Sequence, residues 1–336
     1  MLVPPMPFTI FPDASIIIVS FNTRDLLRDC LLTVKETCSG LSYEIIVVDN
    51  ASRDGSAAMV KQEFPEVRLI HSPINLGFAA ANNRGFEIAQ GRYFILLNSD
   101  AFLKPGALKT AIQYMDEAPL VGLAGGRLVG RDGDWQPSAR MFPSIVNDFL
   151  SISGLSARFP KSRLFGRVDR TWADENQSTE VDWVPGAFSI ISRDVLAEIG
   201  FFDERFFLYY EEVDLCKRIK QAGYKIWYWP DIEVVHLGGE SSKTVKHLTM
   251  SKSGAQLTLW RMRSALLYYR KHHGLMGAWL ERLLETSWHK IRAWKNSGTE
   301  NADSLAKAAD SQNLLSLMRQ AWQETQGGRL SPPRPW

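Results

Sequence analysis

The 336-residue sequence has little cysteine and no long apolar run. Its cysteines, Cys30, Cys38 and Cys216, are an odd, scattered set without the spacing of metal ligands, which is typical of reduced thiols in the cytosol. No run reaches the ~18–20 apolar residues of a membrane-spanning helix. The first twenty residues also lack the positively charged start of a secretory signal. We therefore expect a cytoplasmic protein, and its 45% hydrophobic and 23% charged residues predict a globular one.

Two phosphate-binding motifs are absent as well. No G-x-G-x-x-G follows the first apolar run, and the glycines of residues 122–126 come too late with a different spacing, so a nicotinamide-binding domain is not expected. The motif G-x-x-x-x-G-K-[ST] does not occur either. A nucleotide bound by this chain would therefore be held by something other than a phosphate-cradling glycine loop.

Charge is divided unevenly along the chain. From His236 onward there are 15 Lys and Arg against 7 Asp and Glu, a net charge of +8, whereas the preceding part has 24 against 30, a net charge of −6. The basic part has no dense basic stripe with a motif that reads nucleic acid, so no nucleic-acid partner is expected. It is more typical of a protein that meets a membrane surface or another anionic partner.

The first hundred residues alternate short β-branched runs with longer helical patterns. This alternation predicts βαβ units and a mostly parallel sheet, and therefore an α/β fold. The runs are continuously apolar, as expected for strands that are buried on both faces. The predicted strands are 15–19, 44–48, 67–70 and 93–97, and the predicted helices are 24–37, 56–63 and 79–89.

The rest of the chain is less regular. Residues 131–181 are rich in Arg, Ser, Asp and Pro, which predicts an irregular insertion. A helix is expected from about residue 211 to Gly223, where glycine favours a helix end. The expected organisation is a main α/β domain over 1–245, a basic amphipathic helical extension over 246–295, and a linker, short helix and disordered tail over 296–336.

Polar side chains follow three of the predicted strands. In open α/β sheets ligands bind at the carboxyl ends of the strands, so these side chains are expected to share one edge. Each cluster alone is also explained by the tendency of Asp, Asn and Ser to start turns. Three clusters on one edge favour a nucleotide, because its diphosphate calls for a divalent metal held by carboxylates. The clusters are Ser20 and Asn22, Asp49 and Asn50, and Asn98 and Asp100.

Seven motifs occur in order between residues 15 and about 275. They are SIIIVSFN (15–22), VDNASRDGS (48–56), NLGFAAANNRG (75–85), LLNSDAFL (96–103), PGAF (185–188), GFFDERFFLYYEEVDLCKRIKQAGY (200–224) and VVHLGGESS (234–242). In this order they resemble the family 2 glycosyltransferases, specifically the rhamnosyltransferase-like branch that builds bacterial surface polysaccharides.

The resemblance implies a GT-A catalytic fold, a nucleotide-sugar donor, a divalent metal (Mg²⁺ or Mn²⁺) and inversion at the anomeric carbon. Asp49 matches the carboxylate that reads the base. Asp100 takes the last place of the D-x-D motif, which grips metal and diphosphate, whereas Asn98 stands at its first place, so one anionic ligand is missing. The other donor-binding residues that the resemblance implies are Ser20, Asn22, Asn50, Asn75, Gly77, Asn82 and Asn83.

The run Glu211-Glu212-Val213-Asp214 falls where the family has its base motif, which makes Glu212, with Glu211 beside it, the expected catalytic base. Inverting transfer needs a carboxylate that accepts the proton of the acceptor hydroxyl. The alternative is that acids favour a first helical turn through the helix dipole, which leaves the aromatic lead-in over 206–210 unexplained. His236 matches a histidine that completes the metal's coordination, with a core histidine as the alternative.

An acceptor and sugar pocket is expected around residues 183–187 and Asp214. Trp183, Gly186 and Ala187 are candidates, because small residues let a substrate approach the backbone. A tight turn at a strand edge is the alternative for these positions.

The C-terminal part repeats apolar and aromatic residues near helical spacing, from Leu280 to Trp294, with Arg282 and Lys290 between them. Such a helix suits a membrane interface. The alternative is a helix packed on the main domain or within a homo-oligomer.

These features predict an inverting glycosyltransferase at the inner face of the cell membrane. The expected donor is a dTDP- or UDP-activated sugar, with rhamnose as the first candidate, and the expected acceptor is a glycan or polyprenyl-diphosphate-linked glycan. The alternatives are transfer from UDP-glucose or UDP-galactose, a glycan- or nucleotide-binding relative without turnover, and a glycoside hydrolase, which also uses paired carboxylates.

Overall fold

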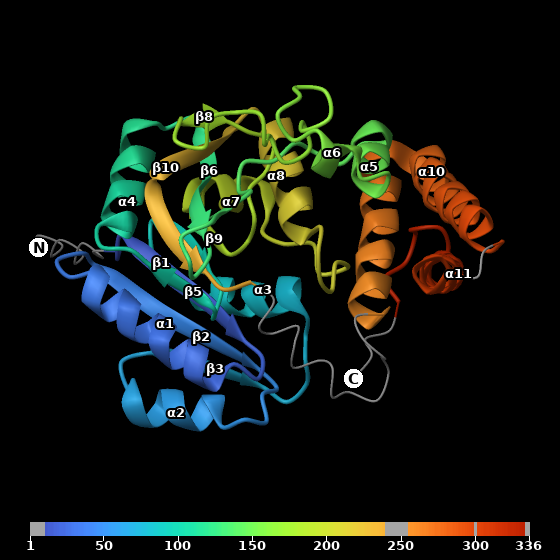
Figure 1. Cartoon of the computed structure of the whole chain (residues 1–336). Coiled ribbons are helices and arrows are strands. Elements are labelled where there is room, and N and C mark those ends of the chain that lie inside the picture. The colour runs from blue at the N-terminus through green and yellow to red at the C-terminus, as the bar shows by residue number, and fades with distance from the viewer. Residues whose placement is uncertain (1–10, 239–254, 299–300, 333–336) are drawn as a thin grey trace, which may run out of the picture.

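The computed structural model describes residues 11–238, 255–298 and 301–332. Its centre is one mixed sheet with the strand order β3-β2-β1-β4-β9-β6-β10-β5, to which β7 and β8 add short pairs (Figure 1). The strands are β1 (Ala14–Ser20), β2 (Tyr43–Asn50), β3 (Arg68–Ser72), β4 (Tyr93–Leu97), β5 (Ala101–Leu103), β6 (Val121–Val129), β7 (Trp135–Gln136), β8 (Thr179–Glu180), β9 (Phe188–Ser192) and β10 (Lys225–His236).

The four predicted strands are present and form the parallel half of the sheet. β1 pairs with β2 and β4, and β2 pairs with β3, all in parallel register. The side chains of Ile16, Ile17 and Ile18 are fully buried, because helices cover both faces of this half. The predicted α/β architecture is confirmed up to β4.

The other half of the sheet contains antiparallel pairs that the strand pattern does not predict. β9 lies between β4 and β6 and is antiparallel to both, and β5 pairs antiparallel with the end of β10. β5 follows β4 at once and carries the chain to the far edge of the sheet. As a result, the ends of β4 and β10 lie close together, with Ala101 paired to His236.

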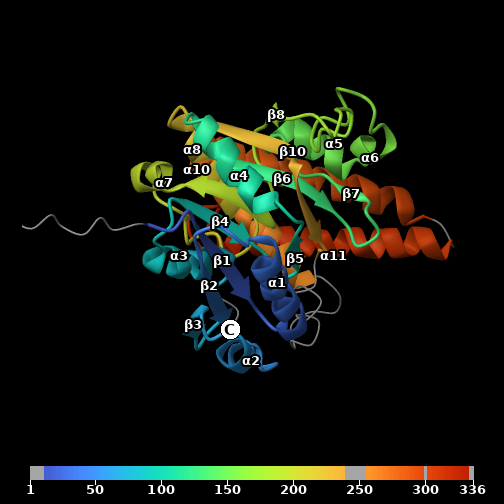
Figure 2. The same cartoon turned by 90° about the vertical axis from the view of Figure 1, so that its left-hand side faces the viewer.

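Helices on the two faces belong to different cores. α1 (Arg24–Thr37), α2 (Ser56–Glu63) and α4 (Ala107–Glu117) pack on one face, with Ile16 and Ile18 among their buried neighbours. α3 (Phe78–Ile88), α7 (Arg193–Ile199) and α8 (Glu211–Gln221) lie on the other (Figure 2). The predicted helix boundaries at 24–37 and 56–63 are those of the structure.

The segment 131–181 contains more regular structure than its composition predicts. α5 (Ile145–Ile152) and α6 (Leu155–Arg158) lie within it. The Ser144 hydroxyl accepts a hydrogen bond from the Asn147 N–H at 3.2 Å and caps α5. The ring of Phe149 meets that of Trp288 at 6.2 Å, so packing on a helix from the far end of the chain stabilises α5.

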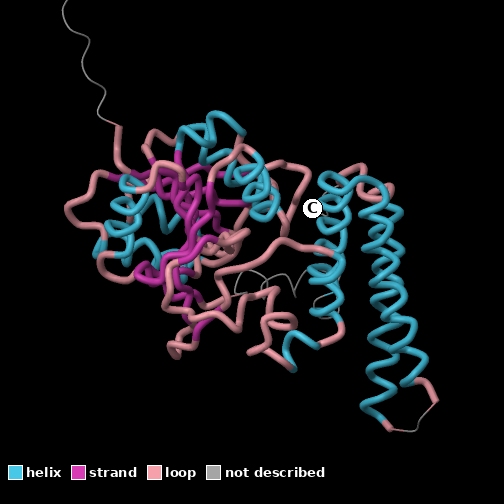
Figure 3. Tube along the Cα trace, turned by 90° about the horizontal axis from the view of Figure 1, so that it is seen from above, coloured by secondary structure: helices cyan, strands magenta, loops and turns pink. Residues whose placement is uncertain are grey.

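Two long helices form the C-terminal part. α10 (Ala255–Asn296) breaks at Gly274, whose φ of 68° and ψ of −171° are not helical, and α11 (Ala302–Glu324) packs against it (Figure 3). α11 spans 23 residues, more than the expected short helix. No helix in the described ranges is long and apolar enough to cross a membrane.

The turn after α11 closes onto the first half of α10. Gly328 has a φ of +80°, and a Cβ at this position would lie 2.1 Å from the Leu266 carbonyl oxygen. Met318 and Ala321 of α11 belong to the same buried core as Leu266 and the α8 residue Leu215. The C-terminal helices are therefore part of the main core.

Candidate active site

A cavity of about 360 Å³ opens at the carboxyl ends of β1, β2 and β4. Its walls combine predicted donor, metal and base residues with the start of α10. Ten predicted residues line it: Asn50, Asn75, Gly77, Asn98, Asp100, Gly186, Ala187, Glu211, Glu212 and His236. Seven other predicted residues are not in its lining: Ser20, Asn22, Asp49, Asn82, Asn83, Trp183 and Asp214.

Two asparagine amides shape the wall beside β2. Asn50 Nδ2 donates to Asn75 Oδ1 at 2.9 Å, and Asn50 Oδ1 accepts from the Leu76 N–H at 2.7 Å. Asn75 Oδ1 also accepts from the Gly77 N–H at 2.9 Å. These bonds fix the chain between β3 and α3 against the end of β2, so both amides serve the shape of the wall.

Gly77 allows this wall to meet the segment that leads to the glutamates. Its φ is +83°, and a Cβ there would lie 2.4 Å from the Phe207 carbonyl oxygen. The next residue, Phe78, donates its backbone N–H to that oxygen at 2.8 Å. The close approach couples the start of α3 to the aromatic lead-in of α8.

Asp49 lies at the end of β2 and is fully buried. Its Oδ2 is 2.8 Å from His71 Nδ1, and its Oδ1 is buried without a hydrogen-bond partner among the described residues. An unsatisfied buried carboxylate oxygen is costly, so this atom is available for a donor group brought by a ligand. Its role in base reading stays a prediction.

The polar residues after β1 mainly hold neighbouring loops. Ser20 Oγ lies 3.1 Å from Thr23 Oγ1. Asn22, with a φ of 54°, accepts a hydrogen bond from the Arg53 N–H at 2.7 Å. These contacts join the turn after β1 to the loop after β2.

The two asparagines of α3 point away from the cavity lining. Asn82 Nδ2 donates to the Phe78 carbonyl of its own helix at 2.9 Å. Asn83 exchanges hydrogen bonds with the backbone of Phe202, at 2.9 and 3.1 Å. Asn83 thereby ties α3 to the loop before α8. Contact of either residue with a donor stays a prediction.

Asp100 and His236 lie next to each other in the cavity wall. His236 Nε2 is 3.6 Å from Asp100 Oδ1. Gln136 Nε2 donates to the His236 carbonyl at 2.8 Å, which turns the Gln136 oxygen toward His236 Nδ1 at 2.9 Å. Nδ1 must then carry the proton, leaving the Nε2 lone pair directed at Asp100. Burial lowers the pKa of His236, against the opposing charge of Asp100.

This arrangement suits a divalent cation shared with a diphosphate. A carboxylate and a neutral imidazole nitrogen are both metal ligands, and Mg²⁺ commonly takes only one or two protein carboxylates and completes its shell with phosphate oxygens. No group of three His, Cys, Asp or Glu side chains that could hold a metal occurs in the described part of the chain. The motif residues 239–242 after His236 lie outside the described residues.

Glu211 and Glu212 begin α8 at the opposite wall. The two residues before them, Tyr209 and Tyr210, have φ values of 69° and 68°, a left-handed conformation that is strained for tyrosine. This backbone turns the start of α8 into the cavity. Each glutamate has one carboxylate oxygen, Oε2, that is buried without a hydrogen-bond partner in the described chain.

Burial raises the pKa of both glutamates. For Glu211 the pKa is well above its usual range, because burial is reinforced by the charge of Glu212. The pKa of Glu212 is also raised by burial, while backbone N–H groups and the Arg140 guanidinium oppose the shift. The arrangement provides a carboxylate pair that can hold or accept a proton beside the cavity.

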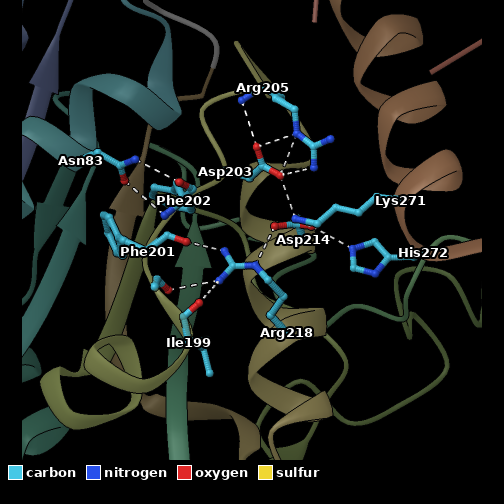
Figure 4. A network of polar contacts seen from close by, with 11 residues as sticks. Asn83, Ile199, Phe201, Phe202, Asp203, Arg205, Asp214, Arg218, Lys271 and His272 are labelled. Carbon is cyan, nitrogen blue, oxygen red and sulfur yellow. Dashed lines mark hydrogen bonds and ion pairs between the residues drawn. The ribbon is translucent and has the colours of Figure 1, made fainter. Parts of the chain in front are cut away.

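Asp214 belongs to an ion-pair network behind the cavity (Figure 4). It contacts Arg218 Nε at 2.9 Å, Lys271 Nζ at 2.6 Å and His272 Nε2 at 2.8 Å. Although burial acts to raise it, these partners hold the pKa of Asp214 below its usual range. Asp214 thus joins α8 to α10 and positions the glutamates, and a direct contact with the acceptor stays a prediction.

Trp183 lies outside the cavity lining, just after the 131–181 segment. Its indole Nε1 donates to the Met141 carbonyl at 2.9 Å, and Arg140 stacks its guanidinium 4.6 Å from the ring centroid. Gly186 and Ala187 line the cavity. Trp183 therefore supports the wall that Gly186 and Ala187 provide.

Some residues in or beside the cavity were missed by the sequence interpretation. Gln136 lies one hundred residues before the histidine it orients. Gln256, Leu257 and Trp260 come from α10, and Trp260 stacks on Phe207 with ring centroids 4.3 Å apart. No motif marks these positions, although the aromatic run before Glu211 signals a packing partner for Phe207.

Comparison with known proteins identifies the family of the chain. The sequence model of glycosyl transferase family 2 matches residues 15–200, and the chain belongs to this family. It is 30% identical over 207 residues to an N-acetylglucosaminyl-diphospho-decaprenol L-rhamnosyltransferase of Mycobacterium tuberculosis, covering 57% of this chain and 66% of the relative. It is 25% identical over 245 residues to the rhamnosyltransferase WbbL of Escherichia coli, covering 68% and 85%. The expected similarity to rhamnosyltransferases is confirmed.

The fold is also shared with a solved structure. The mannosyltransferase PcManGT from Pyrobaculum calidifontis, in complex with GDP-Man and Mn²⁺, superimposes with a TM-score of 0.51 at 16% identity. The match covers 95% of this chain and 81% of that one. The expected GT-A fold is confirmed.

Proposed function

We propose that the protein transfers a sugar, with inversion, from a nucleotide-diphosphate donor to a hydroxyl of a glycan or a polyprenyl-diphosphate-linked glycan. The observation that carries this proposal is the cavity itself. It places two glutamates, each with one unpartnered carboxylate oxygen, and the Asp100–His236 pair around one space at the strand ends.

Glu212 acts as the general base. Two adjacent buried carboxylates resist carrying two negative charges, so one of them keeps a proton. Burial raises the pKa of both carboxyls, so the pair can hold one proton, and the base motif assigns the role of proton acceptor to Glu212. Glu212 takes the acceptor hydroxyl proton as that oxygen bonds to the anomeric carbon. The bond from this carbon to the diphosphate oxygen breaks on the opposite side.

The Asp100–His236 pair serves the leaving group. Asp100 and the His236 Nε2 lone pair would hold Mg²⁺ or Mn²⁺, which supplies positive charge to the departing diphosphate. The PcManGT complex, which contains Mn²⁺ and GDP-Man, supports metal use by this fold. At the end of β2, outside the cavity lining, Asp49 Oδ1 would accept a hydrogen bond from the nucleotide base.

Two rhamnosyltransferases among the relatives favour dTDP-rhamnose as the donor. UDP-glucose or UDP-galactose is the alternative donor. The decaprenol-linked acceptor in the name of the mycobacterial relative supports a lipid-linked acceptor here. Such an acceptor would place the reaction at the cytoplasmic face of the membrane.

The second half of α10 supports a membrane surface as partner, because its polarity is reversed. Its large apolar side chains are exposed: Leu275, Met276, Trp279, Leu280, Leu283, Ile291 and Trp294. Glu281, Glu285 and His289, four residues apart along one stripe, are buried. A helix that exposes its apolar side is expected to be covered by an apolar phase.

The exposed side also carries positive charge. A groove of about 900 Å³ between α10 and α11 contains Trp279, Leu283 and Trp294 together with the cations Arg282, Lys290 and Arg319. Aromatic and basic groups together match the interface of a bilayer with anionic lipids. A homo-oligomer is the alternative cover for this side.

A donor panel tests the proposed reaction. The full-length protein is incubated with dTDP-rhamnose, UDP-glucose or UDP-galactose, with Mn²⁺, and with a lipid-linked N-acetylglucosamine diphosphate or water as acceptor. Release of nucleoside diphosphate that requires both one donor and the acceptor is expected. Nucleotide binding without release would indicate a non-catalytic relative. Cleavage of a glycan without any nucleotide-sugar would indicate a hydrolase.

A further inference from the structure

The 131–181 segment contains a concentration of positive charge. Arg158, Lys161, Arg163, Arg167 and Arg170 fall within thirteen residues that hold one acid, Asp169. That acid is already engaged, because Arg140 Nε donates to Asp169 Oδ1 at 2.6 Å. The stretch therefore offers its five cations no unengaged carboxylate.

Three of these cations surround one pocket. It has a volume of about 340 Å³, lies between α6 and β8 in the chain, and is lined by Lys161, Arg163, Arg170, Trp172, Ala173, Asp174, Gln177 and Thr179. None of its residues lines the catalytic cavity. In the described ranges, no ion pair is formed by Lys161, Arg163 or Arg170. The Asp174 carboxylate in the lining is engaged locally, since its Oδ1 accepts from the Asn176 N–H at 2.9 Å and from Nδ2 at 3.3 Å.

Two of the cations stack on the ring of Trp172. The guanidinium carbons of Arg163 and Arg170 lie 5.0 and 5.5 Å from its ring centroid. Stacking on an aromatic face stabilises each cation, but two guanidinium groups on one ring also repel each other. A negatively charged group between them would relieve that repulsion.

The pocket also has unused hydrogen-bond donors. Arg170 Nε and Trp172 Nε1 are both buried without an acceptor among the described residues. Arg170 has a φ of 51°, a left-handed conformation for a residue that is not glycine, and its Nη2 donates to Thr179 Oγ1 at 3.3 Å. Backbone strain of this kind persists where surrounding contacts enforce it and is common at binding sites.

We propose that this pocket binds a phosphate group. Two guanidinium forks match the paired oxygens of a phosphate, and an ammonium adds a third charge. A phosphate monoester carries close to two negative charges at neutral pH and so balances this set better than a single carboxylate. The group comes from a soluble phosphate compound or from the headgroup of a phospholipid, and the site is independent of the catalytic assignment.

The test follows the indole N–H of Trp172 in the full-length protein. Tryptophan is labelled with ¹⁵N, the Trp172 resonance is assigned by its loss in Trp172→Phe, and inorganic phosphate is titrated at constant ionic strength. A saturable shift is expected in the wild type. Arg163→Gln is expected to weaken the apparent affinity at least tenfold. Arg167→Gln, which removes the same charge from the same segment outside the pocket, should change it by less than twofold.

A second arm separates the two sources of phosphate. Vesicles of phosphatidylcholine with or without phosphatidic acid are added in flotation assays to the wild type, Arg163→Gln and Arg167→Gln. A loss of vesicle binding specific to Arg163→Gln would assign the site to a lipid headgroup, whereas a shift with inorganic phosphate alone would assign it to a soluble compound. The proposal is overturned if neither probe distinguishes Arg163→Gln from Arg167→Gln, or if the Trp172 resonance does not respond.

Discussion

Among the described residues, glutamates with an unpartnered buried carboxylate oxygen occur at the start of α8 and in the second half of α10. Those of α8 line the cavity at the strand ends, and those of α10 do not. Burial raises the pKa of Glu211 and Glu212 and likewise that of Glu281, where the charges of Asp148 and Glu285 add to the effect. Glu281, however, faces other protein groups between α5 and α10. A raised pKa by itself therefore does not identify a candidate catalytic carboxylate. The carboxylate must also have access to a space large enough for a substrate.

The two regions also differ in what they leave exposed. At the start of α8 the two glutamates line the cavity, whereas Val213 and Leu215 of the same helix are buried. In the second half of α10 the carboxylates are buried, and the tryptophans and leucines are exposed. The first arrangement is that of a site for a polar substrate, and the second is that of a surface for an apolar partner.

The largest expected difference between the two regions is in catalysis. Glu212→Gln keeps size and hydrogen bonding but cannot accept a proton, so turnover should fall ~10²–10⁴-fold. Glu281→Gln makes the same chemical change in the other region and should leave turnover within about twofold. Both are measured by nucleoside diphosphate release at saturating donor, with folding checked by circular dichroism. Equal losses in the two variants would contradict the assignment of the base.

A smaller effect is expected on the pH dependence of stability. Burial raises the pKa of Asp148 from 3.8 to about 6, and the charge of Glu285 adds to this shift. A hydrogen bond from Tyr269 and the charge of Arg261 oppose the shift, and Glu281 also faces Asp148. The folded state therefore holds a proton that the unfolded state releases at lower pH. Its stabilising effect is present below pH 3.8 and is lost as the pH rises through 6, roughly 3 kcal/mol in all.

Asp148→Asn removes this titration. Urea unfolding between pH 4 and 7 should show stability falling less steeply with rising pH in Asp148→Asn than in the wild type. Exposed Asp132→Asn, elsewhere in the same segment, is the control and should keep the wild-type slope. If Asp148→Asn has the wild-type slope too, the buried carboxylates on α5 and α10 are not coupled to folding as described.

Gly77→Ala tests the contact between the α3 wall and the α8 lead-in. The alanine Cβ would meet the Phe207 carbonyl oxygen, and the φ of +83° is unfavourable for it. Stability should fall by ~1–3 kcal/mol, and donor affinity should fall with it. Gly106→Ala has a similar φ of +82° with open space around the site, so it separates strain from contact. Equal losses of donor affinity in both would contradict the importance of the contact.

The smallest expected effect concerns the exposed tryptophans of α10. The side chain of Trp294 is 76% exposed, so Trp294→Ser and Trp279→Ser should not alter stability. Each should weaken binding to anionic vesicles about tenfold, since burying a large apolar side chain contributes ~1.5–3 kcal/mol and the interface covers only part of it. Leu120→Ser, 62% exposed on the main domain, is the control. Unchanged vesicle binding, with a shift from dimer to monomer in sedimentation, would favour a second copy as the partner.

The sequence predicted the parallel half of the sheet well. Residues such as Ile16, Ile17 and Ile18 form continuous apolar runs that become buried strands. The helices α1 and α2 between these strands end near the predicted boundaries. Local sequence pattern and burial agree in this half of the molecule. The motifs also drew attention to the glutamate pair, Asp100 and His236, which the structure brings to one cavity.

The rest depends on contacts between distant parts of the chain. β9 lies antiparallel between β4 and β6, and this position depends on pairing with strands that are distant in the sequence. The role of Gln136 follows only from its position opposite His236. Asp214, Lys271 and His272 have the charges of a ligand site but pair with one another. Neither spacing nor propensity reveals such partners.

The seating of Gly328 against Leu266 bears on how the chain matures on the ribosome. The central sheet is complete once β10 has been made, but the α10 wall that carries Trp260 is clamped by the turn after α11. Roughly one hundred residues separate α8 from this turn, and at ~5–20 residues per second their synthesis takes about 5–20 s. During that interval Glu211 and Glu212 have already been synthesised, but the cavity around them is not yet closed. We therefore expect the cavity wall that carries Trp260 to be fixed only after the turn containing Gly328 has been made.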